Sequence, residues 1–297
     1  MARALAAAPI AGLAVWTHIG RGLHLEPELS VRVAESCRAA LPAGRPLVAA
    51  IGARPRVQTT RGKRQRLTPP ANPLALTGFV VSGTLEMARE ATSAGADALL
   101  VFPPILLKDL DDRDNRIVEV HAALKEAGRP VLAWYLDEDE GGIRYSERVL
   151  DRVLALPHVA GIVVTTTDSV VAFQEVARRV PPDKLLISGD DRFLGYSLML
   201  GARAITGAVA AARPGLVHSL LRSYRDGDWS SFVSASARCD ALAAELVREP
   251  LGGVPRRVLH LMAHDGTIPA DSAYDPWGPS VPAWQLEELV NAAARLA

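Results

Sequence analysis

Short apolar runs alternate with longer segments of helical periodicity along most of this chain. Apolar runs of this length are typical of strands buried on both faces of a parallel sheet. Strands are predicted at Gly12–Trp16, Pro46–Ile51, Ala98–Phe102, Pro130–Tyr135, Val159–Val164, Lys184–Ile187 and Ala202–Thr206. Helices are predicted at Glu28–Leu41, Thr84–Ala94, Asp114–Ala127, Tyr145–Ala155, Ser169–Val180 and Arg192–Leu200. This order predicts an α/β fold, because parallel neighbours need a crossover between them.

Helical patterns alone fill the rest of the chain. Helices are predicted at Pro214–Asp226, Trp229–Glu249, Val254–Asp265 and Ala283–Leu296. Gly-Ala-Asp-Ala at 95–98 and Gly-Ala-Arg-Ala at 201–204 are typical of turns from a helix into a strand. No GxGxxG motif follows the first strand, so the repetition favours a (β/α)8 TIM barrel over a dinucleotide-binding sheet. We expect the barrel over 1–213 and a C-terminal helical extension packed on it over 214–297.

The balance of charge and the cysteine content limit the partners and the cellular compartment that we expect for this protein. Thirty-three basic residues balance 33 acidic ones, so no global field attracts nucleic acid or an anionic membrane. No apolar window approaches the roughly 18 residues that span a bilayer. Cys37 and Cys239 lie in segments predicted as helical and lack metal-ligand spacing. We therefore expect a reduced, cytoplasmic protein.

Loops that follow the strands' carboxyl ends build the active site of a barrel. These loops are Thr17–His24, Gly52–Leu76, Pro103–Asp114, Leu136–Gly142, Thr165–Asp168, Ser188–Asp191 and Gly207–Pro214. The search for functional residues is therefore restricted to these segments.

Several motifs in one register resemble those of the dihydrodipicolinate synthase and N-acetylneuraminate lyase family. They are Gly-Ala-Asp-Ala-Leu-Leu-Val-Phe-Pro-Pro at 95–104, Gly161-Ile162, Ser-Gly-Asp-Asp at 188–191, and Gly-Ala-Arg-Ala-Ile-Thr-Gly-Ala-Val from Gly201. The resemblance implies a (β/α)8 barrel with extra C-terminal helices, a homodimer or homotetramer, and pyruvate-dependent aldolase or dehydratase chemistry. It also implies a lysine on the sixth strand that forms a Schiff base with a keto group.

The position that matches this lysine is Val163, which cannot form an imine. The chain's four lysines offer poor substitutes: Lys125 is on a helix and Lys184 begins a strand. Lys63 and Lys108 fall in loops, which lack the desolvated setting that lowers the pKa of an amine.

Other parts of the pyruvate apparatus are also replaced. The family's Gly-Thr-Thr-Gly-Glu segment corresponds to Thr17–Arg21, so the hydroxyls that help bind a carboxylate are gone. Ile105-Leu106 replaces an aromatic pair, and the expected arginine falls within the acidic run 137–140. The Tyr-Asn-x-Pro segment becomes Trp134-Tyr135-Leu136-Asp137. Strand alternation allows only one of Trp134 and Tyr135 to face the interior.

Residues with useful chemistry remain in the same loops. His18 could exchange protons and Arg21 could bind an anion, or both could belong to a solvated loop, as we favour for His24. Tyr135 could donate a proton to an oxyanion or be structural. Thr165, two residues beyond Val163, could hold a substrate or satisfy backbone groups.

Substrate contacts are expected from Arg21, Trp134, Asp190 and Thr206, with His18, Tyr135 and Thr165 as catalytic candidates. Asp190 and Asp191 could alternatively cap the helix that follows them, which we favour. No metal site and no cofactor are predicted, although His18 and Asp190 would be candidates in a metal-assisted aldol reaction.

Two segments depart from a regular barrel. The stretch Arg54–Arg66 carries six basic residues and no acid, and it could be a lid, a solvated insertion or a contact between subunits. Because Thr17–Arg21 matches the loop after the family's second strand, the first strand of the barrel is expected to be missing from this chain. Either the true start lies upstream or the barrel closes in another way.

The sequence therefore predicts a lyase, of carbon–oxygen or carbon–carbon bonds, that acts on a small oxo or hydroxy acid without a lysine Schiff base. Its partner would be a small anionic substrate. The alternative is a non-catalytic barrel that binds a small acid or a protein, since fold does not imply function.

Overall fold

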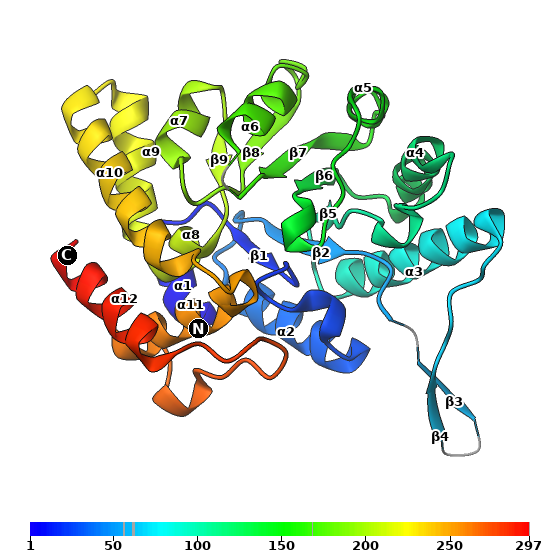
Figure 1. Ribbon diagram of the computed structural model, residues 1–297, viewed down its shortest axis with the longest axis horizontal. Helices are drawn as coiled ribbons and strands as arrows, with labels where there is room; N and C mark the ends of the chain where they lie inside the picture. Colours follow the sequence, from blue (N-terminus) through cyan, green and yellow to red (C-terminus); the bar gives the residue numbers. More distant parts are fainter. Residues whose placement is uncertain (56, 61–62, 168, 297) are drawn as a thin grey trace.

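A curled parallel sheet of seven strands forms the centre of the computed structural model, which describes residues 1–55, 57–60, 63–167 and 169–296 (Figure 1). The strands pair in the order β1-β2-β5-β6-β7-β8-β9. Their bounds are β1 Leu13–Val15, β2 Leu47–Ile51, β5 Ala98–Val101, β6 Val131–Leu136, β7 Val159–Thr165, β8 Leu185–Ser188 and β9 Ala204–Ile205. Each predicted strand is present, and the predicted TIM-barrel fold class is confirmed in the form of a half barrel.

The sheet does not close on itself. No pairing joins β1 to β9 within the described part of the chain, so these two strands are the edges. The gap falls where the family resemblance would place a first strand, in accordance with the expectation that this strand is missing.

The central strands are buried on both faces. All six residues of β6 are buried, and Leu47, Ala49 and Ile51 of β2 are fully inaccessible to solvent. Consecutive apolar residues produce this burial, because alternate side chains point to opposite faces and both faces are covered. The core therefore extends from the inside of the curled sheet to the helices around it.

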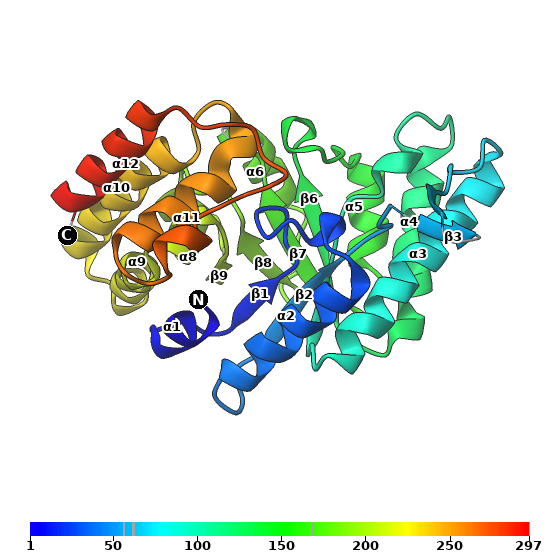
Figure 2. The same ribbon diagram turned by 90° about the horizontal axis from the view of Figure 1, so that it is seen from below.

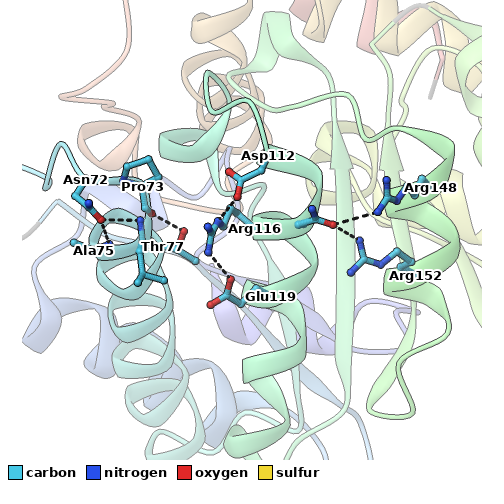
Figure 3. A network of polar contacts seen from close by, with 11 residues as sticks. Asn72, Pro73, Ala75, Thr77, Asp112, Arg116, Glu119, Arg148 and Arg152 are labelled. Atoms are coloured by element: carbon cyan, nitrogen blue, oxygen red, sulfur yellow. Dashed lines mark hydrogen bonds and ion pairs between the residues drawn. The ribbon is translucent and has the colours of Figure 1, made fainter.

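Helices follow the strands and cover the outer face of the sheet (Figure 1). They are α2 Pro27–Ala40, α3 Pro73–Ser93, α4 Arg113–Ala123, α5 Glu147–Leu154, α6 Val170–Ala177 and α7 Leu194–Met199. The predicted start of α3 at Thr84 is wrong, since the helix begins at Pro73. The side chain of Asn72 accepts hydrogen bonds from the amides of Leu74 and Ala75, and proline suits a first helical position (Figure 3).

Polar contacts tie the outer helices together. Arg116 on α4 bonds Asp112, just before the helix, and Glu119 within it, at 2.8 and 3.2 Å (Figure 3). From the same helix, Asn115 accepts a hydrogen bond of 2.7 Å from Arg152 on α5. Exposed contacts of this kind contribute little to stability.

An antiparallel hairpin lies within the basic segment 54–66. Its strands are β3 Val57–Thr60 and β4 Lys63–Arg66, and it projects away from the body of the protein (Figure 1). Arg56 and Arg61 lie outside the described residues. Arg54 pairs with Glu90 on α3 at 3.0 Å. The choice between lid, insertion and subunit contact for this segment stays a prediction.

The remaining helices gather on one side of the molecule, near the short N-terminal helix α1 Ala2–Ala7 (Figure 2). They are α8 Ala208–Ala212, α9 Pro214–Asp226, α10 Trp229–Leu246, α11 Val254–His264 and α12 Ala283–Arg295. Helix α11 packs on α8 and α12. The division into units at residues 213 and 214 stays a prediction. Within the described residues, every helix is too short or too polar to cross a membrane.

Close approach of two strands explains the glycine in the Gly161-Ile162 motif. A Cβ atom on Gly161 would collide with the carbonyl oxygen of Leu185 on β8. We expect Gly161→Ala to lower the free energy of unfolding by about 1–3 kcal/mol, because β8 must move away. The control is Gly215→Ala on α9, where a Cβ meets nothing within 4 Å. Urea titration of both variants checks this, and equal stabilities would contradict it.

Candidate active site at the carboxyl ends of the strands

A cavity of about 80 Å³ opens at the carboxyl edge of the sheet, large enough for several water molecules or one small organic molecule. The loops after β1, β6, β7, β8 and β9 contribute to it, together with residues between α10 and α11. Its lining includes Thr17, His18, Ile19, Leu100, Trp134, Leu136, Glu140, Thr165, Thr167, Gly189, Asp190, Asp191, Thr206, Gly207, Ala208, Val247, Leu251, Val254 and Pro255. Parallel strands bring these loops together, because their carboxyl ends share one edge.

His18 and Glu140 form an acid–base pair in this cavity. His18 Nε2 lies 3.2 Å from Glu140 Oε2. The His18 side chain is 34% exposed and that of Glu140 12%, so solvent reaches the imidazole more than the carboxylate. The two side chains form an ion pair when the imidazole carries a proton.

Arg21 is held outside the cavity. Its backbone is left-handed, with φ 53°, and its Nη2 lies 2.6 Å from Asp275 Oδ2 and donates to the Gly252 carbonyl at 2.7 Å. Arg21 is absent from the described residues that line the cavity. His24 also lies apart, with its ring stacked on Trp277 at 6.0 Å. Arg21 therefore ties the loop after β1 to the C-terminal part of the chain.

Trp134 is the member of the Trp134-Tyr135 pair that faces the cavity. Its Nε1 donates to Thr165 Oγ1 at 3.0 Å, and both residues line the cavity. Tyr135 faces the other way and meets the ring of Tyr145 edge to face at 6.2 Å. Burial raises the pKa of the Tyr135 hydroxyl, and Tyr135 is absent from the lining. Strand alternation thus separates these two candidates.

Val163 occupies the centre of β7, next to Trp134 of β6, and is 2% exposed. The described lining of the cavity includes no lysine. Lys184 Nζ donates to the carbonyl of Val159 at 2.7 Å, which places it at the amino end of β7, the end opposite the cavity.

Asp190 is a buried carboxyl group at the cavity wall. It accepts hydrogen bonds from the Thr166 amide at 2.7 Å and the Thr166 hydroxyl at 3.1 Å. Burial is the main cause that raises the pKa of Asp190 to about 7, with the bonds from Thr166 opposing the rise. Asp190 can therefore hold or release a proton near neutral pH.

Asp191 caps a helix, but not the one expected. It accepts from the amides of Ala208 and Val209 at 2.8 and 2.9 Å, so it caps α8, which follows the next strand. The favoured expectation that the Asp190-Asp191 pair caps the following helix is therefore wrong, because α7 begins after Phe193 with no side-chain cap. Burial raises the pKa of Asp191 to about 6.

Three residues other than glycine, in the loops after β1 and β7, have a left-handed backbone conformation. Trp16, Arg21 and Thr167 have φ values of 59°, 53° and 62°. Such conformations cost free energy and occur often at functional sites. Thr167 Oγ1 is buried without a hydrogen-bond partner in the described structure, and Thr167 lines the cavity.

Some lining residues were missed by the sequence reasoning. Glu140 was treated only as part of an acidic run, although its place in a loop after a strand was a usable signal. Val247, Leu251, Val254 and Pro255 reach the cavity from the C-terminal helical part. Nothing in their local sequence shows this, since the contact depends on how α11 packs. Thr206, by contrast, lines the cavity as expected.

No group of three or more His, Cys, Asp or Glu side chains suited to a metal ion occurs among the described residues.

The fold and the cavity define an α/β protein of the TIM-barrel class, with its candidate site at the carboxyl ends of the strands. A model of the dihydrodipicolinate synthetase family matches residues 74–289, and the chain belongs to this family. The resemblance seen in the sequence motifs is thereby confirmed.

The curated relatives that match the chain share little sequence identity with it. The 4-hydroxy-tetrahydrodipicolinate synthase of Methanosphaerula palustris is 23% identical over 152 residues, which are 50% of each chain. The chain thus spans about half the length of the curated relatives it matches.

Solved structures match more of the chain. YagE from E. coli K12, solved in complex with pyruvate, is 16% identical with a TM-score of 0.80 over 99% of this chain and 90% of that one. N-acetylneuraminate lyase from Mycoplasma synoviae is 18% identical with a TM-score of 0.70, over 99% and 89%. At these identities the likeness shows the fold alone.

Asp190 should make stability depend on pH. Its pKa is raised in the folded state, so its contribution to stability is present at low pH and is lost as the pH rises toward 7. Relative to Asp190→Asn, the wild type should lose about 2–3 kcal/mol of unfolding free energy between about pH 5 and 8. Urea titrations at the two pH values measure this loss. The control is Asp183→Asn, a substitution at an exposed position. If the difference in unfolding free energy between the wild type and Asp190→Asn is the same at both pH values, the raised pKa of Asp190 is contradicted.

Proposed function

We propose that this protein is a lyase that breaks a carbon–oxygen or carbon–carbon bond of a small oxo or hydroxy compound by acid–base catalysis, without an imine. The observation that carries the proposal is the His18–Glu140 pair, 3.2 Å apart, in a cavity that also holds the carboxyl group of Asp190. Such an elimination requires a base and an acid in the same site.

His18 is the base of the proposed reaction. Its Nδ1 takes a proton from the carbon next to a carbonyl group, and the electron pair left on that carbon becomes an enolate. Glu140, at Nε2, stabilises the imidazolium that forms and holds the ring in one orientation.

Asp190 is the matching acid. In its protonated form it gives a proton to the departing hydroxyl group in a dehydration, which leaves as water as the enolate electrons form the double bond. Thr165, held by Trp134, is positioned to donate its own hydroxyl hydrogen to the carbonyl oxygen, because its Oγ1 already accepts from the indole. Thr206 lines the same cavity and offers a further hydroxyl.

The lack of an imine follows from the identity of Val163. Valine has no amine, and the described cavity lining contributes none from elsewhere. Carbanion stabilisation therefore depends on hydrogen bonds to the carbonyl oxygen rather than on a covalent electron sink.

The second candidate is a non-catalytic barrel that binds a small molecule in the same cavity. The presence of Val163 at the position that resembles the family's lysine, and the departures from the family's other pyruvate-binding residues, favour it. A non-catalytic barrel would differ from the lyase in that it binds the small molecule without exchanging its protons or converting it.

Proton exchange tests the role of His18 directly. Hydroxyacetone, dihydroxyacetone and pyruvate are incubated with the protein in deuterium oxide, and loss of the C–H signal is followed by proton NMR. We expect exchange with at least one of them, and His18→Gln should slow it about 100-fold or more. His218→Gln, an exposed histidine on α9, is the matched control and should exchange at the wild-type rate. Unchanged exchange in His18→Gln would contradict this role.

Borohydride trapping tests the missing imine. After incubation with pyruvate or hydroxyacetone and sodium borohydride, the intact mass of the protein should be unchanged, because Val163 offers no amine. A lysine-dependent aldolase treated in parallel shows that trapping works. A reduced adduct located on one lysine would refute the imine-free reaction.

A further inference from the structure

Three basic side chains in the loops after β1 and β6 already hold carboxylates of the chain itself. Arg21 pairs with Asp275 at 2.6 Å, and Arg144 after β6 pairs with Asp137 at 3.3 Å. His18, which belongs to the cavity, pairs with Glu140. A substrate carboxylate would have to displace an acid of the chain to pair with any of these three side chains.

Three backbone amides near the cavity wall also donate to carboxylates of the chain. Asp191 takes the amides of Ala208 and Val209 at the start of α8, and Asp190 takes the amide of Thr166. Amides of this kind would otherwise be suitable donors to an anion. The chain's own carboxylates thus use the donors at the ends of β7 and β9.

Carboxyl and hydroxyl groups make up most of the polar part of the described lining, together with the His18 imidazole and the Trp134 indole. Glu140, Asp190 and Asp191 contribute carboxyl groups, and none of the described lining residues is arginine or lysine. An entering carboxylate would lose its hydration and meet acidic groups, while the one imidazole of the described lining already faces Glu140.

Uncharged polar groups would find partners in the same space. The Thr165 hydroxyl accepts from Trp134 and can donate to a carbonyl, and the buried Thr167 hydroxyl has no partner in the described structure. The carboxylate of Glu140 can accept from a ligand hydroxyl. Leu100, Leu136 and their apolar neighbours suit the carbon skeleton of a small molecule.

We propose that the cavity selects an uncharged small molecule bearing carbonyl and hydroxyl groups, and discriminates against a carboxylate. The inference rests on the proposed function in that it assigns a substrate class to the same site. It departs from the acid expected from the sequence, because Arg21, the cation expected to bind that acid, is paired with Asp275.

Isosteric pairs test this selectivity through binding alone. Pyruvamide and pyruvate differ in charge but hardly in shape, and lactamide and lactate form a second pair of the same kind. Dissociation constants are measured at about pH 8 by ligand-observed NMR titration with the full chain. We expect the uncharged member of at least one pair to bind about tenfold more tightly than its acid. Equal or tighter binding of both acids, or no binding of either uncharged member, would overturn the inference.

Removal of a negative charge inside the cavity is the second test of this selectivity. Glu140→Gln should reduce the preference for pyruvamide over pyruvate by at least about threefold, since one negative charge is lost. Glu138→Gln removes the same charge two residues away, at an exposed position, and should leave the preference unchanged. An equal change in both variants would show that the general field of the protein, not the cavity, sets the preference, and would overturn the inference.

The two proposals fail in different ways. If the uncharged ligands bind preferentially but no proton exchange occurs, only the lyase function is lost. If exchange occurs but pyruvate binds more tightly than pyruvamide, only the substrate class is wrong.

Discussion

Hydrogen bonding between parallel strands is the constraint on which the site depends. The register pairs Trp134 with Val163 and Leu136 with Thr165, so β6 and β7 end together and the indole can reach the Thr165 hydroxyl. The same pairing continues from β7 to β8, and the loop after β8 brings Asp190 to Thr166. A shift of one residue in any pair would turn these side chains to the helical face. Gly161 maintains the ladder because it lets β8 approach closely.

Sequence patterns were sufficient for the seven strands of the parallel sheet but not for the hairpin of β3 and β4, or for every helix or contact. Buried parallel strands have continuous apolar runs, so all seven were predicted within a few residues. The first turns of α3 were missed because the early glycine and threonine residues weaken the helical pattern, although Asn72-Pro73 is a usable start signal. Asp191 and α8 lie in different strand–helix units, so their contact depends on tertiary packing. The same holds for Arg21, whose partner Asp275 is 254 residues away.

Family membership and residue chemistry lead to different expectations here. Membership explains the curled sheet, the cavity and the C-terminal helices. The side chains at and near the cavity are a separate matter: Val163 is apolar and 2% exposed, and the Arg21 guanidinium pairs with Asp275. Such a pair is expected because a buried charge without a partner is costly.

The two free edges of the sheet also bear on how the chain folds. A closed barrel must pair its first and last strands, which lie far apart in sequence, and the entropy of closing so long a loop has to be overcome. In the described sheet each strand pairs only with neighbours in chain order once the inserted hairpin is set aside, as Leu13 does with Leu47 and Ile187 with Ala204. Assembly of the described sheet can therefore proceed by steps that each join strands consecutive in it, and none of these steps has to close its full length into one loop.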